Sequence, residues 1–152
     1  HHVCYFDADS GIAFVGDTAG VRLRESGAVF APTPPPDIDL ERWADSLASL
    51  EAWHPATLFV THFGPVADGA AHIGELRTRL AWAASIVKTS LAREGTDEDR
   101  EAWFADQMRL HLRRVAPDAD VRAAELAAPL GLNWRGLARY WRKREEREQG
   151  AR

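Results

Sequence analysis

Two short segments of this 152-residue chain are apolar on both faces, and they limit its fold more than any other feature. They are residues 12–15 (Ile-Ala-Phe-Val) and residues 57–61 (Thr-Leu-Phe-Val-Thr). A strand that faces water on one side alternates apolar with polar residues, whereas a strand without that alternation belongs to a sheet covered on both faces. We therefore predict a buried sheet that needs a layer of structure on each side.

The remaining pattern divides the chain into an α/β part at residues 1–66 and a helical part at residues 67–152. Residues 2–6 form a second apolar run, and the turn-forming residues after it predict a hairpin with residues 12–15. Apolar side chains at three- and four-residue steps predict an amphipathic helix at residues 38–53. The predicted order in the α/β part is β-β-α-β.

Three or four helices are predicted in the second part. A long apolar stripe covers residues 73–91, and Thr96–Asp99 has the spacing of a capping box with Asp in the place of Glu or Gln. Pro117 ends the helix that this box opens. A short helix at residues 120–128 and a last helix capped by Asn133 follow.

The composition narrows the class of protein. The chain is 45% apolar with a net charge of −4, which excludes intrinsic disorder. It contains no apolar run of the length that a membrane-spanning helix needs, so we expect no membrane segment. Its one cysteine, Cys4, lies in an apolar strand and forms no internal disulfide, which fits a reducing compartment and a cytoplasmic location.

Two titratable residues directly follow the doubly apolar strands. Asp17 comes after residues 12–16, and His62 comes after residues 57–61. The carboxyl ends of the strands are the usual place for ligand and catalytic groups in open α/β sheets. A carboxylate and an imidazole that meet there suit Zn²⁺ or Fe²⁺. A simple turn residue and a turn-capping histidine remain the alternative interpretation.

Three segments in this order resemble a known family. Residues 2–6 (His-Val-Cys-Tyr-Phe), 15–20 (Val-Gly-Asp-Thr-Ala-Gly) and 60–65 (Val-Thr-His-Phe-Gly-Pro) are similar to the second half of the metallo-β-lactamase-fold hydrolases. The first segment resembles the glyoxalase II-like branch (hydroxyacylglutathione hydrolases). The resemblance implies the second half of an αββα sandwich at residues 1–66, followed by a helical C-terminal region at residues 67–152.

The resemblance also implies a metal centre. In that superfamily the aspartate matching Asp17 bridges two divalent metal ions, and the histidine matching His62 completes the shell of the second ion. Zinc is the expected metal, with iron or manganese as alternatives. His2 falls just after a ligand position of the family, so it is expected to contact a metal ligand and not the metal itself.

The superfamily's main signature, His-x-His-x-Asp-His, is absent from these residues. Two candidate ligands, Asp17 and His62, are fewer than the three protein ligands that a catalytic zinc takes. We therefore expect this chain to be the later part of a longer polypeptide, with the N-terminal half of the same fold supplying the other ligands. As an entire protein, the chain would expose a large apolar face and self-associate as a homo-oligomer.

The leading functional hypothesis is a metal-dependent hydrolase acting on a small molecule. A metal-activated water would cleave a thioester, ester or lactone carbonyl, and the helical region would set substrate choice. Asp17 is the expected catalytic residue. Arg22 and His72 are weaker candidates for substrate contact. The alternative interpretation is an ordinary surface charge for Arg22 and a structural histidine for His72.

Two other functions follow from different features. Residues 125–135 and the helix after them resemble a helix-turn-helix, and residues 131–152 carry seven Lys/Arg against three Glu. Arg135, Arg139, Arg142 and Lys143 could meet nucleic-acid phosphates. Pro129, Trp134 and Trp141 favour a packed helical hairpin instead of a nucleic-acid-binding module. The third hypothesis is a metal-free, degenerate fold that acts as a binding partner.

Overall fold

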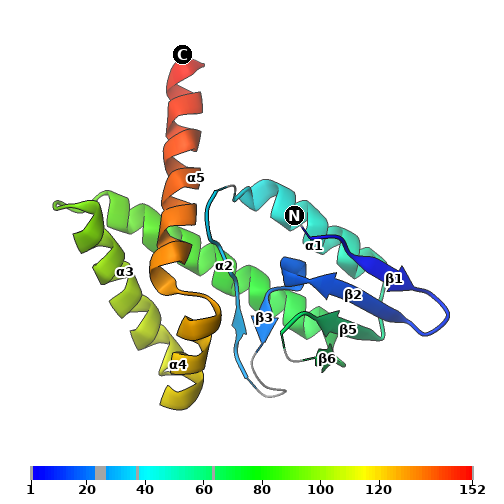
Figure 1. Cartoon of the computed structure of the whole chain (residues 1–152). Helices are drawn as coiled ribbons and strands as arrows, with labels where there is room; N and C mark the ends of the chain where they lie inside the picture. Colours follow the sequence, from blue (N-terminus) through cyan, green and yellow to red (C-terminus); the bar gives the residue numbers. More distant parts are fainter. Residues whose placement is uncertain (1, 23–26, 37, 63, 152) are drawn as a thin grey trace. The chain divides into compact units, whose positions relative to one another are not determined.

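The computed structural model describes residues 2–22, 27–36, 38–62 and 64–151 (Figure 1). Its contacts divide the chain into two compact units. Unit 1 comprises His1–Pro32 and Leu40–Leu80, and unit 2 comprises Thr33–Asp39 and Ala81–Arg152. The elements are β1 (Tyr5–Asp7), β2 (Ile12–Gly16), the 3₁₀ turn η1 (Asp17–Ala19), β3 (Val21–Arg22), β4 (Val29–Phe30), α1 (Leu40–Ala52), β5 (Thr57–Val60), β6 (Gly64–Val66), α2 (Gly69–Leu91), α3 (Asp97–Leu112), α4 (Asp118–Ala127) and α5 (Leu130–Gly150).

Unit 1 contains a mixed four-stranded sheet in the order β1-β2-β5-β6. β1 and β2 form the predicted antiparallel hairpin, and β2 pairs with β5 in parallel across the α1 crossover. The predicted β-β-α-β order is present. β6 pairs antiparallel with β5 at the other edge of the sheet, and β3 and β4 form a separate two-stranded sheet.

One face of the four-stranded sheet is buried against the helices. Ala13 and Val15 of β2 and Leu58 and Val60 of β5 are at most 2% exposed. They belong to one hydrophobic cluster with residues of η1, β4, β6, α1 and α2. The helical members of that cluster are Leu47, Leu50, Ile73 and Leu76.

The opposite face of the sheet is open in the part of the chain that the structure describes. Tyr5, Phe14 and Phe59 are 67%, 47% and 41% exposed. They stand in register across β1, β2 and β5, and the Phe14 and Phe59 ring centroids are 5.5 Å apart. Buried and exposed side chains alternate along each strand, so the described residues cover one face of the sheet and leave the other open. The second layer over that open face stays a prediction.

The observed division of the chain differs from the predicted boundary between residues 66 and 67. The first half of α2 belongs to unit 1 because Ile73 and Leu76 complete the sheet's core. The segment Thr33–Asp39 belongs to unit 2 because Thr33 is hydrogen-bonded to Asn133. A continuous helix that serves two cores gives no break in composition from which a boundary could be read.

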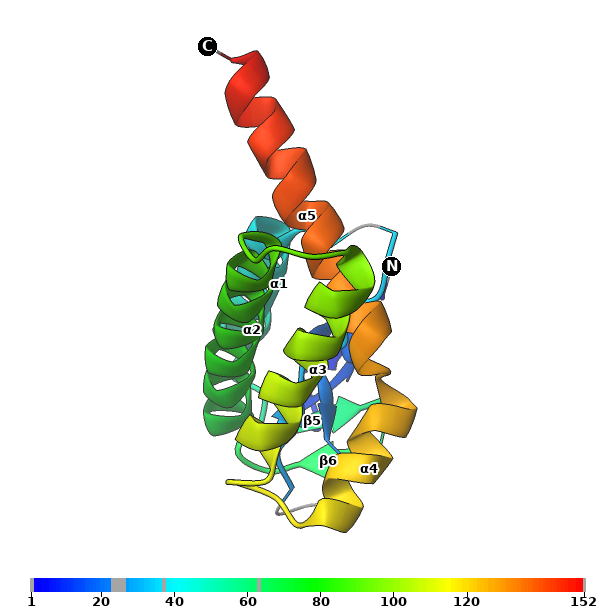
Figure 2. The same ribbon diagram turned by 90° about the vertical axis from the view of Figure 1, so that its left-hand side faces the viewer.

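Unit 2 consists of the second half of α2 with α3, α4 and α5, and α3 packs along α5 (Figure 2). The predicted capping box opens α3. The Thr96 side chain accepts a hydrogen bond from the Asp99 amide, and the Asp99 carboxylate accepts one from the Thr96 amide. No helix in the described ranges is both long and apolar enough to cross a membrane.

The prediction that Asn133 caps the last helix is wrong. Helix α5 begins at Leu130, directly after Pro129, and Asn133 lies inside it. The buried Asn133 amide accepts a hydrogen bond from the Thr33 amide and donates one to the Ala128 carbonyl. A tertiary partner 100 residues away in the sequence therefore uses the polar side chain that looked like a cap.

Candidate metal-ligand site

The site is built on the turn that follows β2. Gly16 and Gly20 bracket the three residues of η1, and both glycines have positive φ, at 53° and 75°. A Cβ on Gly16 would lie 2.9 Å from His2 Nδ1, and a Cβ on Gly20 would lie 2.6 Å from the Phe30 carbonyl oxygen. The two glycines therefore allow a sharp exit from the strand and a close packing of the turn that residues with a side chain would resist.

Asp17 and His62 lie side by side at this edge of the sheet. Each follows the carboxyl end of a strand, and the two strands, β2 and β5, are parallel neighbours. His62 Nε2 is 3.6 Å from Asp17 Oδ1. This distance is longer than a hydrogen bond between nitrogen and oxygen, so the two groups face each other without a direct bond.

His2 approaches the other side of the same carboxylate. Its Nε2 lies 3.4 Å from Asp17 Oδ2, and its Nδ1 lies 3.4 Å from the Asp17 amide nitrogen, which donates to it. The ring packs over Gly16, where a side chain would collide with it. The side chain of Asp17 is 25% exposed, and those of His2 and His62 are 48% and 40% exposed.

The arrangement of Asp17 and His62 fits a divalent metal ion. Asp17 Oδ1 is buried and has no hydrogen-bond partner among the described residues. A buried carboxylate oxygen normally contacts a hydrogen-bond donor or a cation, and this one contacts neither there. Zinc ligands at about 2.0–2.2 Å from a tetrahedral ion lie roughly 3.3–3.6 Å from one another. The separation of 3.6 Å between Oδ1 and Nε2 agrees with that spacing.

Two donors do not make a complete centre. Within the described ranges, no group of three or more His, Cys, Asp or Glu side chains is placed to hold a metal ion by itself. A catalytic zinc takes three protein ligands. His2 therefore counts as a neighbour of Asp17, and any further ligand would come from outside these residues.

His72 is buried, whereas a residue that contacts substrate would need to be accessible. It is 1% exposed on α2, and its Nε2 makes a 2.7 Å hydrogen bond to the Ala19 carbonyl of η1. Burial lowers the pKa of His72 below its ordinary value, so the ring is neutral near pH 7. An enclosed ring cannot touch a substrate, and His72 is instead a contact between α2 and the turn that carries Asp17.

Arg22 on β3 is half-buried, and its Nε donates to the Gly27 carbonyl at 3.0 Å. No contact of the structure tests its predicted role in binding substrate.

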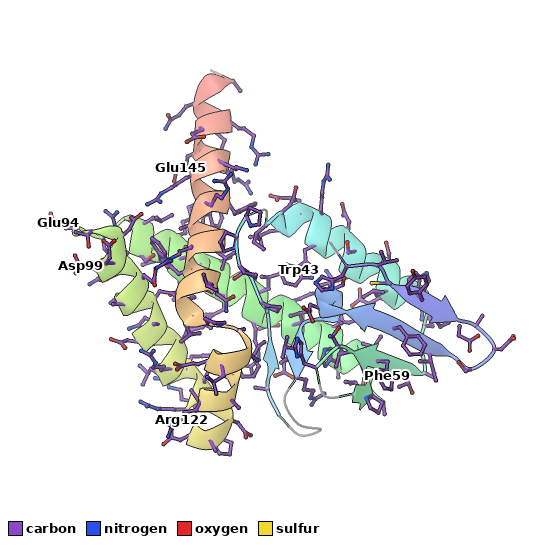
Figure 3. The ribbon with its side chains drawn as sticks, in the orientation of Figure 1. Trp43, Phe59, Glu94, Asp99, Arg122 and Glu145 are labelled. Carbon is purple, nitrogen blue, oxygen red and sulfur yellow. The ribbon has the colours of Figure 1, made fainter. Side chains whose placement is uncertain are left out.

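Trp43 is a residue of the site that the sequence pattern did not single out. It lies on α1 (Figure 3), and its indole nitrogen donates a 2.7 Å hydrogen bond to the Thr18 carbonyl in η1. Its place on a helical apolar stripe predicted packing alone. The one available signal was the N–H group, because a partly buried tryptophan usually needs an acceptor for it.

Two cations of the segment that resembled a helix-turn-helix form ion pairs within unit 2. Arg135 pairs with Glu101 at 2.7 Å, and Arg142 pairs with Asp97 at 2.7 Å, which lowers the pKa of that carboxyl group. Trp134 is 2% exposed and donates to Ser90. These contacts favour the packed helical hairpin over the nucleic-acid-binding interpretation.

Comparison with known proteins adds a likeness in fold. No protein-family model and no curated protein matches the chain. A solved structure of a metallo-beta-lactamase family protein from Thermus thermophilus matches 95% of the chain, with a TM-score of 0.60 and 17% sequence identity. The chain has part of the metallo-β-lactamase fold.

The match has two limits. The chain spans 40% of the length of the Thermus protein. At 17% identity, the likeness concerns the fold. The glyoxalase II-like branch, the sandwich and the metal-ligand roles of Asp17 and His62 stay predictions.

Proposed function

We propose that this chain is part of a metal-dependent hydrolase, in which Asp17 and His62 bind the same metal centre. The observation that carries the proposal is the buried, unpartnered Oδ1 of Asp17, which lies 3.6 Å from His62 Nε2. It occurs where strands of an α/β sheet present functional groups, on a fold shared with a metallo-beta-lactamase family protein. The expected metal is zinc, with iron or manganese as alternatives.

A divalent ion of this kind lowers the pKa of a water molecule and polarises a carbonyl oxygen, which suits the hydrolysis of a thioester, ester or lactone. The chain's own part is to fix the donors. Asp17 directs Oδ1 toward His62 and Oδ2 toward His2, so its carboxylate would hold the metal centre together with His62. His2 holds the Asp17 carboxylate and amide from the other side, which limits rotation of the carboxylate.

The remaining ligands require a second layer of protein. We propose that the open face of the sheet packs against the N-terminal half of the same fold. The in-register row of Tyr5, Phe14 and Phe59 supports this proposal, because it is an apolar strip across β1, β2 and β5. The length of the Thermus protein leaves room for such a layer, since the chain spans 40% of it.

The test uses the full-length natural protein that contains this chain, purified with zinc in the buffers. Asp17→Asn and His62→Gln should each reduce bound zinc, measured by mass spectrometry of the metal content. They should also abolish turnover of whichever thioester, ester or lactone the wild type cleaves. Asp9→Asn is the matched control, because Asp9 lies in an exposed turn of the same unit.

Two results would count against the proposal. One is a wild-type protein that contains no metal after this purification. The other is a pair of folded variants at Asp17 and His62 that bind as much zinc as Asp9→Asn.

A further inference from the structure

All three backbone carbonyl groups of η1 are hydrogen-bonded, and each has a donor from a different part of unit 1. The Asp17 carbonyl accepts from the Gly20 amide at 2.9 Å, within the turn. The Thr18 carbonyl accepts from Trp43 Nε1 on α1, and the Ala19 carbonyl is bonded to His72 Nε2 on α2, both at 2.7 Å. The turn is therefore held from two helices.

We infer that Trp43 and His72 are positioning residues for the Asp17 carboxylate. This inference rests on the proposed function, in which Asp17 is a metal ligand. Only the first carbonyl of a three-residue 3₁₀ turn has a partner within the turn, so outside donors decide where the Thr18 and Ala19 carbonyls point. With its carbonyl groups fixed, the turn can present the Asp17 side chain in only a narrow range of directions.

Both donors come from rigid surroundings. His72 is next in sequence to Ile73, which is 1% exposed in the core, and Trp43 lies one helical turn before Leu47, which is also 1% exposed. Neither donor can follow the turn if the turn moves. The distance between Asp17 Oδ1 and His62 Nε2 therefore depends on both helices.

The hydrogen bond also fixes the state of the His72 ring. A carbonyl oxygen can only accept, so Nε2 carries the proton. Nδ1 then carries none in the neutral ring, and it is buried without a hydrogen-bond partner among the described residues. A proton on Nδ1 would place an uncompensated charge there, so the neutral ring with the proton on Nε2 is the form that holds the turn.

The test compares Trp43→Phe and His72→Leu, which remove the donors, with His72→Gln, whose amide nitrogen can replace Nε2 as a donor. Ile73→Val is the control, because it changes a buried neighbour on α2 that makes no hydrogen bond to the turn. Carbonyl ¹³C shifts at Thr18 and Ala19 are measured in the full-length natural protein after its metal has been removed. Zinc affinity is measured by competition with a chelator in the full-length natural protein.

We expect Trp43→Phe to move the Thr18 carbonyl shift and His72→Leu to move that of Ala19. Both should weaken zinc binding by about 10–100-fold, as loss of a group that orients a ligand does. His72→Gln should lie closer to the wild type, and Ile73→Val should change neither quantity.

Two results would overturn the positioning role. One is unchanged carbonyl shifts in the donor-free variants, and the other is zinc affinity no weaker than in Ile73→Val. A wild-type protein that binds none of zinc, iron and manganese would overturn the proposed function itself. The carbonyl shifts would then still decide whether Trp43 and His72 hold the turn.

Discussion

Replacing Gly20 by alanine should destabilise unit 1 more than the same substitution at its other glycines. The backbone at Gly20 has φ 75° and ψ −167°, a region that is essentially restricted to glycine and costs other residues about 1–3 kcal/mol. The added Cβ would also lie 2.6 Å from the Phe30 carbonyl oxygen and 2.8 Å from Leu76 Cδ1. The carbonyl is backbone and cannot rotate away, so overpacking adds about 1–3 kcal/mol.

Together these effects lower the free energy of unfolding by roughly 2–6 kcal/mol. Urea unfolding followed by tryptophan fluorescence measures the change. Gly74→Ala is the control, because a Cβ there meets nothing within 4 Å on α2. Alanine is the better helix former, so this variant should gain up to about 1 kcal/mol. A Gly20→Ala protein within about 0.5 kcal/mol of the wild type, the range of neutral surface changes, would refute the described turn geometry.

Three further results are expected. Burial lowers the pKa of His72, so the unfolded state binds more protons; unfolding free energy should fall as pH drops below the ordinary value of 6.5, by at most about 1.4 kcal/mol per pH unit. Urea titrations from pH 7.5 to 5 that give the same slope for wild type and His72→Gln would contradict this. Thr96→Ala should lose about 0.5–2 kcal/mol in urea unfolding because it breaks the α3 capping box, and a loss no greater than that of the exposed Thr89→Ala would argue against the cap. The 152-residue chain should self-associate through its open sheet face in sedimentation, and Phe14→Thr with Phe59→Thr should reduce the association; a wild-type monomer would remove that expectation.

The parts of the fold that follow local rules could be predicted from the sequence. Helical periodicity located α1 at Leu40–Ala52, close to the predicted 38–53, and the Thr96–Asp99 spacing identified the start of α3. The two short apolar strands predicted that Asp17 and His62 lie at one sheet edge. They do so because β2 and β5 are adjacent and parallel.

The remaining features depend on contacts between distant residues, for which a single sequence carries no local signal. β3 and β4 have two residues each, too few to show a period. His72 was a weak candidate for substrate contact, and its structural role had no local signal because its partner, the Ala19 carbonyl, lies 53 positions earlier. The apolar pattern identifies Phe14 and Phe59 as residues on a face that needs cover, but it does not say which residues cover that face, which is open here.

The most direct test of the account is the position of zinc in a crystal structure of the full-length natural protein, located by its anomalous scattering. The account predicts a zinc ion about 2.0–2.2 Å from both an Asp17 carboxylate oxygen and His62 Nε2, with its other protein ligands from residues outside this chain. A zinc ion held by only one of these two side chains, or Asp17 and His62 turned toward separate surroundings, would contradict it.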